Sequence, residues 1–212
     1  MRDIPVFTTQ YGVASLILKE IPYSADAYIR MQNTIDPEKL LQECVSFCCA
    51  AGAERVYAAG HTYLENYPLH TVIFAMCCMK AMLPDTDAEL IPVCEETLEQ
   101  WRSLYNNKMN GIDNATYLSL ADAQKILVAG EGYFIYRGTD LLGIGVVSKD
   151  TIRAVASLQA GAGADIVSAL CRVLTTDTVS LEVASTNTKA ISLYQRIGFQ
   201  FGNEVSRWYK II

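Results

Sequence analysis

Two stretches in the second half of the chain combine residue types that could bind an anion and transfer a proton. In the first, Gly161 and Gly163 lie in the run L-Q-A-G-A-G-A, just ahead of an amphipathic segment. In the second, Asn187 precedes a short amphipathic segment and Tyr194 follows seven residues later, which places both on one side of a helix. A Gly-rich turn between strand and helix is typical of anion sites, because the first helical N–H groups are unpaired and the macrodipole adds about half a positive charge.

Each of these residues also has a purely structural interpretation. A Tyr on an apolar helix face is most often a core residue with a satisfied hydroxyl, and Asn187 could act only as a helix cap. The two glycines could simply permit close packing of the helix on the sheet. By spacing alone, the turn could also belong to a dinucleotide fingerprint, but the third Gly and the later acidic residue of that motif are missing.

The residues around Asn187 and Tyr194 extend into a longer pattern. An apolar, β-branched run at residues 179–183 indicates a buried strand, and Gly198 stands where a helix would stop. The pattern N-x-x-A-x-x-L-Y-x-x-x-G-F is complete, with Asn187, Ala190, Leu193, Tyr194, Gly198 and Phe199. It resembles the C-terminal signature of the GCN5-related N-acetyltransferase (GNAT) superfamily. The resemblance is strong over roughly the last third of the chain and weaker from about residue 88.

The resemblance implies an α+β (α/β) fold of GNAT type, with a mixed, mostly antiparallel central sheet flanked by helices. Hydrophobic periodicity predicts helices over 95–106 and 119–128, a hairpin over 132–148 and a strand over 151–158. The composition of residues 84–87 is that of a linker, so we place a domain boundary there. Residues 85–212 are then the acetyltransferase-like domain. Residues 1–84 form a small α+β region, either a degenerate GNAT-like half or an unrelated unit.

In this family a turn of the form Q/R-x-x-G-x-G/A holds the pyrophosphate of coenzyme A. Gly161 and Gly163 match this motif, but Leu158 stands where Gln or Arg is expected. That departure indicates an altered turn, weaker coenzyme binding or a loss of catalysis. The resemblance implies acetyl-coenzyme A as the cofactor, and its binding residues would be Val155, Ala156, Leu158, Gly161, Ala162, Gly163, Ala164, Asn187, Ala190 and Tyr194.

The resemblance also assigns catalytic roles. The Tyr194 hydroxyl would donate a proton to the leaving thiolate as general acid, and a backbone N–H of the strand before the turn would donate to the oxyanion. A general base is harder to identify. Strand alternation puts Glu182 on the face opposite its neighbours, where it could take the amine proton through water or be an ordinary solvated carboxylate. Glu131 and Tyr133 are other candidates.

Composition narrows the classes of function. The net charge of −6 argues against a nucleic-acid binder, and it fits either an amine-bearing partner or ordinary solubility. Seven Cys in mostly apolar surroundings, with only two His, predict reduced thiols in a cytoplasmic protein and no metal site. The N-terminus lacks an apolar signal core, and no apolar run reaches ~18 residues, so we expect no membrane segment.

We therefore expect a cytoplasmic N-acetyltransferase that transfers acetyl to a primary amine of a small molecule or protein by direct attack. The alternative is a non-catalytic GNAT-like module that binds coenzyme A or another protein, and Leu158 favours this alternative. A third class is an assembly protein, in which the N-terminal sheet would form a homodimer surface.

Overall fold

The computed structural model describes residues 5–113 and 115–212 and divides into two compact units. Unit 1 contains the residues up to Val72 together with Glu204–Ile212, and unit 2 is Ile73–Asn203. Two strands, β5 (Leu69–Met79) and β11 (Gln200–Lys210), run through both units. This division differs from the boundary expected after residue 84, because residues 84–87 lie inside unit 2 and the last residues return to unit 1. The predicted functional domains stay a prediction.

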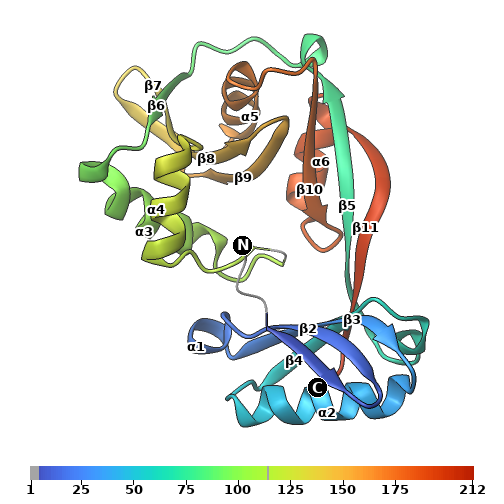
Figure 1. Cartoon of the computed structure of the whole chain (residues 1–212). Helices are drawn as coiled ribbons and strands as arrows, with labels where there is room; N and C mark the ends of the chain where they lie inside the picture. The colour runs from blue at the N-terminus through green and yellow to red at the C-terminus, as the bar shows by residue number, and fades with distance from the viewer. Residues whose placement is uncertain (1–4, 114) are drawn as a thin grey trace. The chain divides into compact units, whose positions relative to one another are not determined.

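Unit 2 is a sheet with helices on both faces (Figure 1). Its strands are hydrogen bonded in the order β11-β5-β10-β9-β8-β7-β6. Among the pairs of unit 2 whose register is described, only β9 and β10 run parallel. The elements that follow β5 are η2 (Lys80–Met82), β6 (Glu89–Pro92), η3 (Glu95–Thr97), α3 (Leu98–Met109), α4 (Leu120–Ala129), β7 (Gly132–Arg137), β8 (Asp140–Ser148), β9 (Thr151–Ser157), α5 (Gly163–Arg172), β10 (Thr178–Ala184) and α6 (Thr188–Arg196).

The two faces of this sheet have separate apolar cores. On one face α5 and α6 pack against a cluster that includes Ile166, Leu170, Leu181 and Val183. On the other face α3 and α4 pack against a cluster that includes Trp101, Ile144 and Ala156. Because successive strand side chains alternate between faces, these clusters show which face each site residue of β9 and β10 meets.

Unit 1 is a sheet in the order β1-β2-β3-β4-β11, and α2 packs on it through Leu40, Leu41, Cys44 and Cys48. Strands β2 and β3 form an antiparallel hairpin, and α2 follows it. Asp36 caps α2 by accepting a hydrogen bond from the Lys39 backbone N–H at 3.1 Å, and Pro37 takes the first helical position. The elements of unit 1 before β5 are β1 (Val6–Thr9), β2 (Gly12–Ile17), α1 (Ile21–Ser24), β3 (Asp26–Thr34), α2 (Pro37–Ala50), β4 (Arg55–Ala59) and η1 (Thr62–Asn66).

Two series of elements along the chain follow the same order. The series β1-β2-β3-α2-β4-η1-β5 corresponds to β7-β8-β9-α5-β10-α6-β11. In both series the third and fourth strands pair parallel across a helical connection. The last strand of each series is also inserted beside the fourth strand of the other, since β11 neighbours β4 and β5 neighbours β10. The predicted fold class, a mixed and mostly antiparallel sheet flanked by helices, is confirmed.

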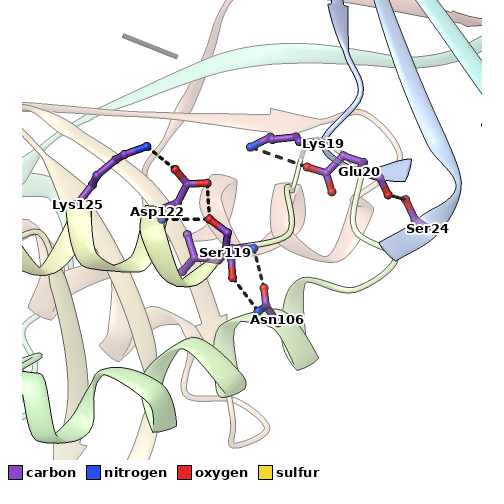
Figure 2. A network of polar contacts seen from close by, with 8 residues as sticks. Lys19, Glu20, Ser24, Asn106, Ser119, Asp122 and Lys125 are labelled. Atoms are coloured by element: carbon purple, nitrogen blue, oxygen red, sulfur yellow. Dashed lines mark hydrogen bonds and ion pairs between the residues drawn. The ribbon is translucent and has the colours of Figure 1, made fainter. Parts of the chain in front are cut away.

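The loop between α3 and α4 is fixed at its end by polar contacts (Figure 2). The Asn106 side chain bonds both backbone groups of Leu118, at 2.8 and 3.0 Å. The Ser119 hydroxyl accepts from the Asp122 N–H at 3.1 Å and so caps α4, and Lys125 reaches the Asp122 carboxylate at 2.8 Å. This end of the loop is thereby held close to α3.

Among the helices that the structure describes, none combines the length and apolar character needed to span a membrane.

Trp101 offers a test of how unit 2 is held together. Its side chain is fully buried, and its Nε1–H donates to the Tyr133 carbonyl of β7 at 3.0 Å. We expect Trp101→Ala to lower the free energy of unfolding by about 3–5 kcal/mol, measured by urea titration, because it leaves a large cavity. The control Leu120→Ala, on the half-exposed face of α4, should change it by only about 0.5 kcal/mol. Equal effects of the two substitutions would contradict this description of the core.

Candidate functional site

Strands β9 and β10 are paired at one end and unpaired at the other. The paired residues are Ser180 with Thr151 and Leu181 with Ile152. Beyond Ile152 no pairing between the two strands is described, although β9 continues to Ser157 and β10 to Ala184. Over the same length β9 stays paired with β8, and β10 stays paired with β5. We call residues 153–157 and 182–184 the open ends of these strands.

Alternation of the backbone shows which N–H groups face the open ends. The Leu158 N–H donates to the Leu142 carbonyl of β8 at 2.8 Å. Since successive N–H groups of a strand point to opposite sides, those of Val155 and Ser157 point toward β10, and that of Ala156 points toward β8. Of the expected coenzyme-binding residues Val155, Ala156 and Leu158, Val155 is therefore the one whose N–H faces the open ends.

The two glycines of the turn after β9 differ in their surroundings, which distinguishes a role in ligand binding from a role in helix packing. Gly161 has φ +85°, and a Cβ built there would meet no atom within 4 Å. Its backbone needs glycine, and the space beside it is open. A Cβ on Gly163 would instead lie 2.6 Å from Leu193 Cδ2 of α6. Gly163 therefore serves the close packing of α5 on α6, whereas Gly161 leaves room that a ligand could occupy.

The first turn of α5 has no side-chain cap. The residue before it is Ala162, and within the described chain the N–H groups of Gly161, Gly163 and Ala164 have no hydrogen-bond partner. The corresponding helix of unit 1 differs, because Asp36 fills the same position with a carboxylate and Pro37 removes one N–H. Unpaired N–H groups at a helix start attract anions, and the start of α5 offers such groups where the start of α2 has a carboxylate and a proline.

Tyr194 packs against the same apolar cluster as Val155, Ala164 and Ala190, so these expected site residues lie on the same face of the sheet. Its ring is partly buried and packs on Phe199, with ring centroids 5.7 Å apart. No hydrogen bond of its hydroxyl is found within the described part of the chain. Burial raises the pKa of Tyr194 to about 12, so the phenol keeps its proton at neutral pH and can donate it.

Asn187 caps α6, since its Oδ1 accepts from the Ala190 N–H at 3.2 Å. It also lines a pocket of about 220 Å³ that includes the α3–α4 loop and the start of α6. In this pocket the Thr186 hydroxyl donates to the Asp113 carboxylate at 2.6 Å. Sequence reasoning missed Asp113, because it lies in a loop without any motif.

Glu182 lies on the exposed face of β10, in register with Ala75 of β5. Its neighbours Leu181 and Val183 join the cluster that Tyr194 borders. Glu182 and Tyr194 therefore lie on opposite faces of the sheet. The other candidate bases, Glu131 and Tyr133, are separated from β9 because β8 lies between β7 and β9.

Other chemistries find little support in the described residues. No group of three or more His, Cys, Asp or Glu side chains that could hold a metal ion is found among them. Every cysteine is a free thiol. Burial raises the pKa of Cys44 and of Cys171 to about 12, which keeps both thiols protonated and poorly nucleophilic.

Comparison with known proteins relates this chain to the GNAT fold. No protein-family model and no curated protein sequence matches the chain. Among solved structures, a candidate acetyltransferase from Pyrococcus horikoshii matches with TM-score 0.63 and 9% identity, over 95% of this chain and 69% of that one. A tandem GNAT protein from the clavulanic acid biosynthesis pathway matches with TM-score 0.56 and 10% identity, over 94% and 78%.

A protein of unknown function from Staphylococcus epidermidis matches with TM-score 0.61 and 13% identity, over 99% of this chain and 94% of that one. These likenesses extend over nearly the whole chain, including the first 84 residues. The chain thus has the fold of GCN5-related N-acetyltransferases, as its C-terminal signature predicted.

The close approach of Gly163 to Leu193 gives a second prediction. We expect Gly163→Ala to destabilise the protein by about 0.5–1.5 kcal/mol, because its methyl group overlaps Leu193 Cδ2 and the Leu193 side chain must turn away. Gly163→Ala should cost less stability in a Leu193→Ala background than in the wild type, because the overlapping side chain is then absent. Thermal unfolding of the two single variants and the double variant measures this coupling. Strictly additive effects would mean that Gly163 does not serve this packing.

Proposed function

We propose that the chain is an acetyl-coenzyme A-dependent N-acetyltransferase that transfers acetyl to a primary amine by direct attack. The observation that carries the proposal is the pair of open strand ends, which leads into an uncapped helix start. That arrangement offers backbone donors for an extended amide-bearing chain, followed by unpaired N–H groups for an anion. The GNAT fold supports the same reading.

The residues present fit coenzyme A. The N–H groups of Gly161, Gly163 and Ala164 would hold the diphosphate, and the open space beside Gly161 would receive it. The open ends of β9 and β10 would take the pantetheine arm, with Val155 N–H available for the thioester oxygen. Ala162, Ala190 and Asn187 would line the arm further along. Bound acetyl-coenzyme A would supply an acetyl group activated as a thioester.

Two side chains would act as the general acid and the general base. The transfer forms a C–N bond and breaks a C–S bond, so the amine must lose a proton and the thiolate must gain one. Tyr194 suits the second task, because its hydroxyl stays protonated at neutral pH and lacks a protein partner in the described chain. Glu182 suits the first, since its carboxylate is exposed on the other face of the sheet, where an acceptor could approach.

We further propose that the first series of strands is a degenerate GNAT-like half without a cofactor site. Strands β3 and β4 are paired from Asp26 with Arg55 through Arg30 with Ala59, which is the last residue of β4. No open ends remain there for a pantetheine arm. The carboxylate of Asp36 at the start of α2 would also repel a diphosphate.

Binding and turnover can be tested separately. Isothermal titration should give one coenzyme A per chain, and millimolar acetyl-coenzyme A should raise the melting temperature by mass action. A panel of primary amines with acetyl-coenzyme A, followed by release of free thiol, should then identify an acceptor. A protein that shows neither heat of binding nor a thermal shift would not be an acetyltransferase of this kind.

Tyr194→Phe tests the general acid. We expect kcat to fall by about 10²–10⁴ while the Kd for coenzyme A stays near that of the wild type, because only the proton donor is lost. Since the pKa of Tyr194 is about 12, its deprotonation should not lower the rate of the wild type at any pH below about 11. A loss of rate centred near pH 9 that disappears in Tyr194→Phe would contradict this assignment.

Leu158 keeps a second function open, that of a non-catalytic module that binds coenzyme A. This alternative predicts a normal Kd together with no thiol release for any amine. The acceptor class, the cytoplasmic location and a homodimer formed through the N-terminal sheet stay predictions of the sequence.

A further inference from the structure

Arg137 lies at the end of β7, beside the first turn of α5. Its Nη2 lies 2.7 Å from Oδ1 of Asp165, the third residue of α5, and its Nε donates to Asp87 at 2.7 Å. The neighbouring β7–β8 hairpin also meets the glycine turn directly, since Gln159 Nε2 donates to the Leu141 carbonyl at 3.3 Å. The guanidinium is therefore bonded to a side chain in the first turn of α5, the turn that also carries uncapped N–H groups.

Carboxylates near the start of α5 would weaken the binding of an anionic ligand there unless a cation lies close by. Residues 158–164 contain no basic residue, and Leu158 replaces the polar residue of the family motif. Asp165 and Asp87 add two carboxylates close to the helix start. Without a neighbouring cation, these carboxylates would oppose the attraction that the N–H groups exert on an anion.

We propose that Arg137 is a binding residue for the diphosphate of coenzyme A and supplies the charge that Leu158 does not. The inference rests on the proposed function. The Arg137 side chain is 44% exposed, and in the described chain its ion pairs use only Nε and Nη2. The guanidinium has five N–H donors in a planar fork, so it can bond a phosphate oxygen while it keeps Asp165. Asp87, whose side chain is 73% exposed, competes for the same donors.

A purely structural role for Arg137 is the rival explanation. The segment at residues 86–88 is tied to both ends of α5: Thr86 bonds Asp165, and Arg172 donates to the carbonyls of Thr86 and Ala88. Arg137 could serve only as one more tie through Asp87. The two explanations predict different effects on coenzyme A affinity when the Asp87 carboxylate is removed. Removing Asp87 would weaken a tie, but it would release a phosphate-binding guanidinium and take away a repelling charge.

Calorimetric Kd values for coenzyme A and for pantetheine, which lacks the diphosphate and nucleotide, distinguish the two roles. We expect Arg137→Gln to weaken coenzyme A binding about tenfold or more, the effect of one charge-assisted hydrogen bond, and to leave pantetheine binding unchanged. Asp87→Asn should leave coenzyme A binding equal or about two- to threefold tighter, because a competing exposed charge is lost.

Arg172→Gln is the matched control. It removes the same residue type and unties the same segment, but its guanidinium bonds the carbonyls of Thr86 and Ala88 and not Asp165 in the first turn of α5, so it should leave both Kd values unchanged. The inference is overturned if Arg137→Gln binds coenzyme A as the wild type does. It also fails if Asp87→Asn and Arg172→Gln weaken coenzyme A binding as much as Arg137→Gln. If the wild type itself binds no coenzyme A, the proposed function fails together with this inference.

Discussion

The separation of β9 from β10 is the constraint on which the rest of unit 2 depends. Backbone groups left unpaired inside a sheet cost free energy, so two strands can diverge only if each is held from its outer side. The described pairing satisfies this requirement, because β8 follows β9 to Ser157 and β5 follows β10 to Ala184. The packing of α5 and α6 on one face and of α3 on the other then keeps both strands in place.

The two units show how one order of elements can keep or lose a ligand site through few changes. In unit 1 the parallel strands are paired to the end of β4, and the following helix starts with an acidic cap and a proline. In unit 2 the parallel strands stop pairing early, and the helix starts with small residues and no cap. The difference lies in local turn chemistry and in the pairing of a few residues, while the topology is shared.

Features that depend on local chemistry could be predicted from the sequence. The caps Asp36, Ser119 and Asn187 are of residue types that favour this position, and a cap is decided within four residues. The glycine turn and the amphipathic helix after it were equally local. The candidate site was therefore predictable where a motif carried it, namely the turn and the face of α6.

Features that depend on distant segments could not be predicted. The insertion of β5 beside β10 joins residues that are about half the chain apart, and no periodicity encodes that partnership. Arg137 lies on another strand than the turn that it approaches, and Asp113 lies in a loop without a pattern. Strand alternation placed Glu182 on the face opposite its neighbours. It could not show that the N–H of Val155, and not that of Leu158, points toward β10, because that direction depends on the register of β9 with β8.

The reciprocal insertion of β5 and β11 bears on how the chain is made. In unit 1, β4 pairs with Tyr209 and Lys210 of β11, so this sheet remains incomplete until these two residues have left the ribosome. Unit 2 in turn needs residues of β5 that were synthesised long before β10. Neither half can finish folding as an autonomous early domain, and such long-range pairing slows folding and exposes strand edges meanwhile. A nascent chain of this kind would depend on chaperones more than a pair of independent domains of the same length.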